Sequence, residues 1–197
     1  MTHFNIILYD GFELLDAFGP AEMIGSAAEL YRLGFYSLAG GLIVSAQNAE
    51  IQTRPFSQMD AAGVLLIPGG TSSRTLAGDP DFVGAIKALA EQAEFVLNVC
   101  TGAALLANTG LLNGRAATTN KQAFAWVSSQ SREVHWQKRA RWVRDGKYYT
   151  SSGVSAGMDM TLAFIRDRHG EELVRKICAD TEYVWNSDPD NDPFGLA

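Results

Sequence analysis

The sequence predicts an α/β fold: one domain, built as a three-layer sandwich with a mostly parallel sheet and helices on both of its faces. Apolar runs such as FNIILYD at 4–10 and GVLLIPGG at 63–70 are continuous and short, as in strands buried on both sides. Segments with helical spacing lie between such runs, and this alternation is typical of βαβ units. With 197 residues, 47% of them hydrophobic and 19% charged, the chain can bury one core.

The N-terminal half supplies strands and helices in alternation. Pro20 falls near the first turn of its expected helix, where the missing N–H costs nothing, and Asp79 and Asp81 give a later helix an acidic start. Gly40 and Gly41 separate two short strands. We expect a strand at 4–10, a helix at 14–31, short strands at 35–40 and 42–46, a buried strand at 63–70 and a helix at 79–93.

The C-terminal half continues the pattern. Asp145-Gly146 between two alternating runs predicts a hairpin, and Ser155 and Gly170 are the expected N-cap and C-cap of a long helix. We place the domain at 1–185 and a polar, proline-containing tail at 186–197. The expected elements are a strand at 94–99, helices at 101–110 and 120–129, the hairpin at 140–153, and helices at 155–170 and 171–185.

Charge and composition exclude several classes of protein. Sixteen basic and 22 acidic residues give a net charge of −6, a poor basis for nucleic-acid binding. No apolar run reaches the ~18 residues of a membrane span, and the N-terminus carries no positively charged leader, so we expect a cytoplasmic protein with a small-molecule substrate. Two cysteines are too few for a disulfide scaffold, and the three histidines are scattered rather than spaced as metal ligands.

Three loops follow predicted strands, at 10–16, 68–71 and 99–101, and ligands bind at the carboxyl ends of such strands. In the last loop, Cys100 lies between a strand and a helix, the geometry of a nucleophile elbow. The helix N-terminus is expected to lower the thiol pKa from ~8.5 toward neutrality. A buried structural cysteine is the alternative, and this stretch alone does not decide between them.

The other two loops offer an oxyanion site and a proton carrier. Gly69 and Gly70 can turn backbone N–H groups toward the neighbouring loop, although a plain turn explains them equally well. Asp16 lies in an apolar setting that would raise its pKa and suit it to proton transfer, with an N-cap role as the alternative. His135 and His169 have no partner readable from the sequence, so Asp16 is the expected acid/base.

Four segments together resemble the ThiJ/PfpI superfamily, and within it the isocyanide (isonitrile) hydratase branch. The resemblance extends from the first strand to about Asp180 and implies a flavodoxin-like fold of the class I glutamine amidotransferase type. The segments are VCTGAALLANTGLLNGRAATT, LIPGGT, LLDAFGPAE and RDGKYYTSSGVSAGMDM.

The resemblance implies a homodimer without cofactor or metal, and it assigns roles to particular positions. Cys100 corresponds to the nucleophile and Asp16 to the general acid/base, and backbone amides line the site. The residues implied for oxyanion and substrate binding are Gly69, Gly70, Thr71 and Thr101. The segment 119–121, Thr-Asn-Lys, departs from relatives that place a histidine beside the cysteine.

The resemblance therefore implies hydration of an isonitrile to a formamide through a Cys100 thioimidate. We expect an apolar pocket for the substituent, with aromatic residues such as Phe12, Phe18, Phe124 or Trp185 nearby. One alternative is another cysteine-dependent reaction of the superfamily, of the glyoxalase or small-amidase type, although the missing histidine argues against an amidase. The other is a non-catalytic redox or ligand sensor with an oxidisable Cys100.

Overall fold

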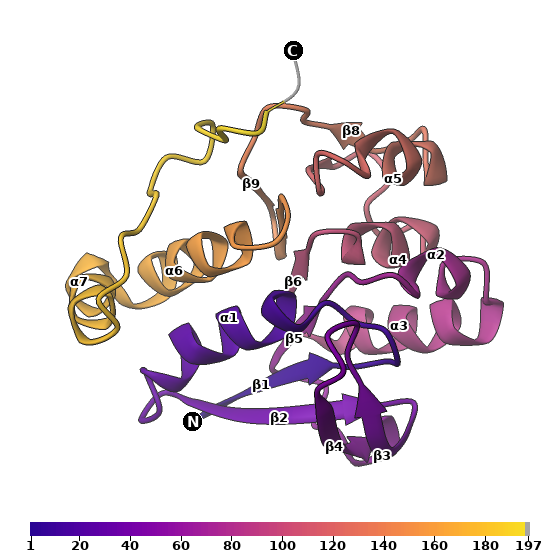
Figure 1. Ribbon diagram of the computed structural model, residues 1–197, viewed down its shortest axis with the longest axis horizontal. Coiled ribbons are helices and arrows are strands. Elements are labelled where there is room, and N and C mark those ends of the chain that lie inside the picture. Colours follow the sequence, from indigo (N-terminus) through magenta and orange to yellow (C-terminus); the bar gives the residue numbers. More distant parts are fainter. Residues whose placement is uncertain (196–197) are drawn as a thin grey trace.

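The computed structural model describes residues 1–195 and has the expected three-layer α/β architecture, with an eight-stranded sheet between two layers of helices (Figure 1). The two edge strands, β3 and β9, are antiparallel to their neighbours and all other pairings are parallel. The strands lie in the order β3 (Ala39–Val44), β4 (Glu50–Pro55), β2 (Tyr31–Ser37), β1 (Thr2–Ile7), β5 (Val64–Ile67), β6 (Phe95–Val99), β10 (Tyr148–Ser151), β9 (Trp142–Asp145). A separate two-stranded sheet pairs β7 (Ala116–Ala117) with β8 (His135–Trp136).

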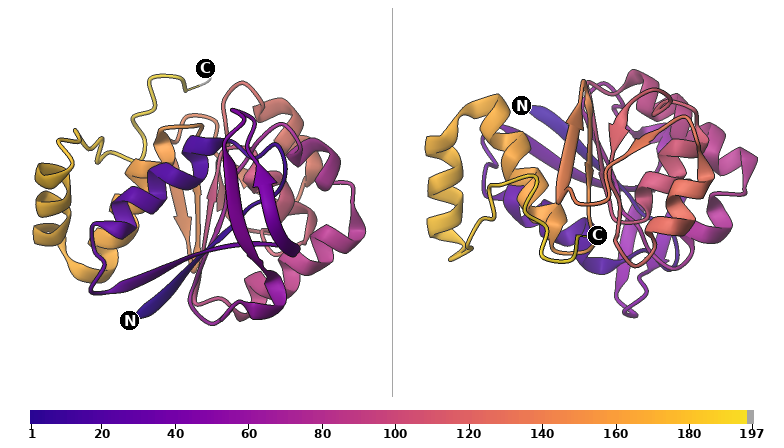
Figure 2. Two further views of the ribbon diagram at one scale, coloured as in Figure 1. Left: turned by 60° about the horizontal axis from the view of Figure 1, so that its bottom comes forward. Right: turned by 90° about the horizontal axis from the view of Figure 1, so that it is seen from above.

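Helices cover both faces of the sheet, as the two views of Figure 2 show. Because both faces are covered, every residue of β5 is buried, which explains its unbroken apolar sequence. None of the helices in residues 1–195 combines the length and apolar character that crossing a membrane would need. One face carries α1 (Leu14–Gly25), α6 (Ala156–His169) and α7 (Glu171–Asp180), and the other carries α2 (Ser73–Leu76), α3 (Pro80–Gln92), α4 (Gly102–Asn108) and α5 (Phe124–Gln130).

The first helix differs from its prediction in two ways. It ends at Gly25 rather than at residue 31, because Tyr31 already belongs to β2 and pairs with β1. Pro20 lies inside the helix and not near its first turn. The strand β4 was not expected either: its sequence is polar and ends in Pro55, as suits a strand that pairs antiparallel with the exposed edge strand β3.

Most of the later elements match their predictions. The hairpin of β9 and β10 forms around Asp145-Gly146, and Gly170 ends α6 with φ of +88°, whereas Ser155 makes no side-chain cap bond. The last helix stops at Asp180 rather than 185. Three groups beyond it bond to Asp159 of α6 instead: the Tyr183 hydroxyl, the Trp185 ring N–H and the Asn186 backbone N–H.

The C-terminal segment packs against the domain. In Figure 1 it runs from α7 toward the strand β9, and the backbone N–H of Arg141 donates to the carbonyl of Pro189 at 2.6 Å. The Asp192 side chain is fully buried, 3.6 Å from Lys121 Nζ and 3.7 Å from Arg141 Nη1. Of the expected tail, residues 196–197 lie outside the described part of the chain.

The sheet topology creates a crevice at one position. From β1 the chain moves outward to β2, then crosses back to β5 on the other side of β1, so the order of strands reverses between β1 and β5. In open α/β sheets such a switch point separates the loops at the carboxyl ends of its two strands, and ligands bind there. The loop into α1 and the loop after β5 border this crevice.

Candidate active site

Two loops meet at the crevice with their backbones in contact. Glu13 N–H donates to the Gly69 carbonyl at 2.9 Å, and Thr71 N–H donates to the Gly11 carbonyl at 3.0 Å. Gly70 has φ of +144°, and a Cβ there would overlap the Gly11 carbonyl oxygen. Only glycine combines this conformation with so close an approach, so the PGGT sequence is required where the two loops touch.

Asp16 lies beneath this junction, in the first turn of α1 rather than in the loop, and Glu13 occupies the N-cap position. Its side chain is fully buried and accepts a hydrogen bond from the Gly69 backbone N–H at 2.9 Å. Burial raises the pKa of Asp16 well above its usual value, the Gly69 N–H opposes that rise, and the charge of Glu13 adds to it. Asp16 is therefore an acid that retains its proton to higher pH than an exposed carboxyl does.

Cys100 lies between β6 and α4 with φ of +58°, a left-handed conformation that costs a non-glycine residue about 1–3 kcal/mol. Its backbone is held from two sides. The Cys100 N–H donates to the Ser151 carbonyl at 3.2 Å, and its carbonyl accepts from Thr119 Oγ1 at 2.7 Å. The Asp16 carboxyl lies close enough to the Cys100 thiol for its charge to raise the thiol pKa, and its buried Oδ1 has no hydrogen-bond partner among the described residues. The structure thus brings together the two residues that the sequence predicted for chemistry.

The expected lowering of the Cys100 pKa is wrong, because the structure raises it. Cys100 is only 6% exposed, so burial raises the pKa of its thiol, and the negative charge of Asp16 raises it further. The Thr101 N–H and the Asn120 side chain oppose the rise but do not overcome it. The thiol and the carboxyl therefore titrate as a coupled pair, and the first proton to leave gives one negative charge that the two groups share.

Asn120 is a site residue that the sequence did not reveal. It lines the same pocket as Cys100, and its side chain acts to lower the pKa of the thiol. Gly153 leaves the room for it, because a Cβ on Gly153 would overlap Asn120 Nδ2. The only signal was the Thr-Asn-Lys departure at 119–121, which was interpreted as a missing histidine. An amide that can donate to sulfur occupies that place.

The glycine amides are not free to meet a substrate as predicted. Gly69 donates to Asp16, and Gly70 donates to Thr101 Oγ1 at 3.1 Å, which also accepts from Ser73 Oγ at 2.9 Å. A Cβ on Gly69 would come within 2.6 Å of Thr101 N. Gly69 therefore holds the Asp16 carboxyl in place through its N–H. The oxyanion role predicted for the Gly69 and Gly70 amides stays a prediction, and it requires these hydrogen bonds to rearrange.

A pocket of about 350 Å³ opens above Cys100, and more of its lining surface is apolar than polar, although several of its side chains are polar or charged. The expected aromatic lining is wrong: Phe12 is fully buried in the core, and Phe18, Phe124 and Trp185 do not line this pocket either. The pocket is lined by Glu13, Gly70, Thr71, Arg74, Cys100, Thr101, Asn120, Gln122, Ala123 and Val154.

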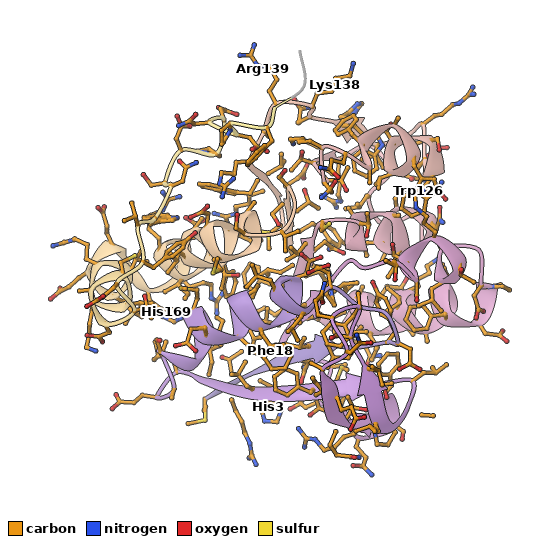
Figure 3. All side chains as sticks on the ribbon, viewed as in Figure 1. His3, Phe18, Trp126, Lys138, Arg139 and His169 are labelled. Carbon is orange, nitrogen blue, oxygen red and sulfur yellow. The ribbon has the colours of Figure 1, made fainter. Side chains whose placement is uncertain are left out.

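No histidine borders this pocket within residues 1–195. His169, at the end of α6 and far from α4 in Figure 3, shares a hydrogen bond of 2.7 Å with the Tyr31 hydroxyl, and His135 lies in β8. In the same described range, no three His, Cys, Asp or Glu side chains gather as metal ligands would. Of the two carboxyl groups near the thiol, Glu13 accepts hydrogen bonds from Gln47, whereas Asp16 is the one whose charge acts on the thiol.

Two kinds of curated relative match this chain. An isonitrile hydratase from Pseudomonas putida is 27% identical over 183 residues, which cover 91% of this chain and 78% of the hydratase. The HTH-type transcriptional regulator GbdR of Pseudomonas aeruginosa strain UCBPP-PA14 is 30% identical over 177 residues, covering 86% of this chain but 47% of the regulator. The same domain therefore occurs in an enzyme and as part of a longer regulator.

Solved structures agree with the fold. A ThiJ/PfpI family protein from Pseudomonas syringae superposes with a TM-score of 0.81 at 25% identity, covering 98% of this chain and 76% of that one. DJ-1beta from Drosophila melanogaster gives a TM-score of 0.80 at 17% identity, covering 93% and 99% of the two chains. The sequence matches the DJ-1/PfpI family over residues 4–167. The chain belongs to the DJ-1/PfpI family.

Proposed function

We propose that this protein is a hydratase that adds water to an isonitrile, R–N≡C, and releases the N-substituted formamide. Cys100 is the nucleophile and Asp16 the general acid/base. The observation that carries this proposal is that the buried Asp16 carboxyl lies close to Cys100, which lines a pocket that no described histidine borders. The match to the P. putida isonitrile hydratase over most of both chains supports it.

The first half of the reaction uses the single proton of the Cys100–Asp16 pair. The thiolate sulfur forms a bond to the terminal isonitrile carbon, and the Asp16 carboxylic acid gives its proton to that same carbon. The product is a thioimidate, R–N=CH–S–Cys100, beside an Asp16 carboxylate. The raised pKa of Asp16 is what keeps this proton available at neutral pH.

The second half consumes water. The Asp16 carboxylate takes a proton from water while the hydroxide adds to the thioimidate carbon, and this proton passes to the substrate nitrogen. The C–S bond then breaks as the new hydroxyl loses its proton to Asp16 and becomes the formamide carbonyl. The thiolate and the protonated Asp16 are restored, so the sum is R–N≡C plus water giving R–NH–CHO.

Neighbouring groups stabilise the charge on sulfur. The Thr101 backbone N–H and the Asn120 side chain both favour the thiolate, because each acts to lower the pKa of the thiol. The Asn120 side-chain amide and the Thr101 N–H thus act on the sulfur, which loses its negative charge in the first half-reaction and regains it in the second. The homodimer and the cytoplasmic location that the sequence analysis expects remain part of this proposal.

The main alternative is ligand sensing, which the match to GbdR favours because that regulator shares most of this chain's length. Oxidation sensing has less support, since peroxide reacts with thiolates and burial raises the pKa of Cys100. Another cysteine-dependent hydration of the glyoxalase type would use the same pair, whereas amide hydrolysis lacks a histidine to protonate the leaving amine.

The test is direct assay. Wild-type protein is incubated with cyclohexyl isocyanide, and the formamide is followed by liquid chromatography and mass spectrometry beside the Cys100→Ala and Asp16→Asn variants. We expect turnover by the wild type, none by Cys100→Ala, and in Asp16→Asn a loss of turnover. Full activity in Cys100→Ala would refute the nucleophile. Binding of alkyl and aryl isocyanides without any formamide would favour the sensor.

A further inference from the structure

Two charged side chains on the pocket walls have no part in the reaction described above. Glu13 comes from the loop before α1, and both of its carboxylate oxygens accept hydrogen bonds from Gln47 Nε2 at 2.9 Å. Arg74 comes from α2, and among residues 1–195 no carboxylate pairs with it. The pocket therefore has a carboxylate that is hydrogen-bonded within the protein and, among residues 1–195, a guanidinium that forms no ion pair.

The Arg74 guanidinium is held in place by stacking. Its Cζ lies 4.3 Å from the centre of the Trp126 ring, and Figure 3 labels Trp126 where α5 comes close to α2. Stacking uses the flat face of a guanidinium and leaves the N–H groups at its edge able to donate in its plane. These donors match the two oxygens of a carboxylate.

The backbone beneath Arg74 is fixed to the catalytic loops. Ser73, the preceding residue, donates from Oγ to the Gly70 carbonyl at 2.7 Å and to Thr101 Oγ1 at 2.9 Å. Thr101 directly follows Cys100, so α2 is tied to the loop that carries the thiol. The backbone of Arg74 is thus anchored near Cys100, and its exposed side chain lies over the Trp126 ring.

We propose that Arg74 binds a carboxylate on the substrate, so that the site prefers small anionic isonitriles to neutral ones. This proposal rests on the proposed function only in naming the isonitrile. The volume of about 350 Å³ suits a small molecule, and Arg74, Asn120 and Gln122 place charged and polar groups on a lining that is otherwise largely apolar. The chain carries a net charge of −6, so its overall field repels anions. A local cation is what such a substrate needs, and Arg74 is the one that lines this pocket.

The alternative is that Arg74 only packs against Trp126. A matched pair of thiol reagents separates the two roles, because iodoacetate carries a carboxylate and iodoacetamide is neutral, while both alkylate Cys100. The ratio of their second-order rate constants is measured by mass spectrometry for the wild type, for Arg74→Met and for Arg74→Lys. Arg32→Met, which removes an exposed arginine of β2 that does not line the pocket, is the control for total charge.

We expect Arg74→Met to lower the iodoacetate rate by about tenfold, the loss of one charge-assisted contact, and to leave the iodoacetamide rate nearly unchanged. Arg74→Lys should retain part of the selectivity, and Arg32→Met all of it. Equal loss of both rates would show that Arg74 acts on the thiol or on the fold. An unchanged ratio would refute the anion site.

A second measurement does not depend on thiol reactivity. The Cys100→Ser protein is titrated with isocyanoacetate, and with its methyl ester as the neutral control, while the arginine Nε–Hε signals are followed by NMR. The Arg74 signal is assigned by its absence from Arg74→Met. We expect isocyanoacetate alone to shift it in a saturable way, and no shift with either ligand would refute the proposal.

The failure of this proposal and that of the hydratase give different results. If the protein is not a hydratase, formamide is absent with every isonitrile, yet the reagent ratio and the NMR titration still report on Arg74. If Arg74 does not bind anions, both of those readouts stay flat. Isocyanoacetate is then hydrated no better than its methyl ester, and Arg74→Met leaves the KM for isocyanoacetate unchanged.

Discussion

The backbone N–H of Gly69 donates to Oδ2 of Asp16 at 2.9 Å, joining the end of β5 to the first turn of α1 across the crevice. This bond favours the ionised carboxyl, whereas complete burial favours the protonated one, and burial prevails because the pKa of Asp16 is raised. The fold thus holds an acid in a place where its charge is disfavoured. Such an arrangement suits proton transfer, and it costs stability wherever Asp16 is ionised.

The first prediction is that Asp16→Asn is more stable than the wild type near neutral pH. Because the folded-state pKa of Asp16 lies above the unfolded value, the wild type has its full stability below the unfolded pKa and loses stability as the pH rises through the folded pKa. The loss is about 1.4 kcal/mol per pH unit within that window. Urea unfolding across the pH range measures it.

The control for this prediction is Glu22→Gln, an exposed carboxylate on the same helix. The free energy of unfolding of Glu22→Gln should change with pH in the same way as that of the wild type. The Asp16→Asn advantage should vanish near the unfolded carboxyl pKa of about 3.9. An advantage that is constant with pH would mean that the substitution acts through packing and not through the proton.

The second prediction concerns the pH dependence of activity. The reaction proposed above needs one proton on the Cys100–Asp16 pair, and burial raises both pKa values. We therefore expect kcat/KM for isonitrile hydration to rise with pH through the first ionisation of the pair, well above the usual carboxyl range, and to fall only when the second proton leaves. A rate that is flat from about pH 4 upward would contradict a raised first pKa.

The sequence predicted which loops meet but not how deep the site is. Cys100 and Gly69 lie just beyond buried strands, and Asp16 lies in the first turn of the helix that follows β1. Parallel strands bring their carboxyl ends to one edge, so the meeting of these three residues follows from the pattern. The direction in which the Cys100 pKa shifts cannot be predicted from the sequence pattern, because it depends on burial by segments that are distant in the sequence. Asn120 escaped prediction for the same reason: it reaches the thiol from a connection with no local signal.

The third prediction tests the backbone of Cys100. With φ of +58°, a residue that has a Cβ is strained there and glycine is not. We expect the free energy of unfolding of Cys100→Gly to exceed that of Cys100→Ala by about 1 kcal/mol. The backbone strain that glycine relieves in the folded state outweighs the greater conformational entropy of glycine in the unfolded state. Chemical denaturation compares the two directly. Equal or lower stability of Cys100→Gly would mean that this turn relaxes when the sulfur is gone.

The last prediction concerns the C-terminal segment. Asp192 is buried beside Lys121 and Arg141, and burial lowers the pKa of Lys121 while the Asp192 charge opposes this. Asp192→Ala should destabilise the protein by about 3 kcal/mol, because it leaves a buried cation uncompensated. Adding Lys121→Met should recover part of that loss. Asp190→Ala, on an exposed residue of the same segment, is the matched control. Chemical denaturation compares the wild type, the two single variants and the double variant. Equal stability of Asp190→Ala and Asp192→Ala would refute the ion-pair account.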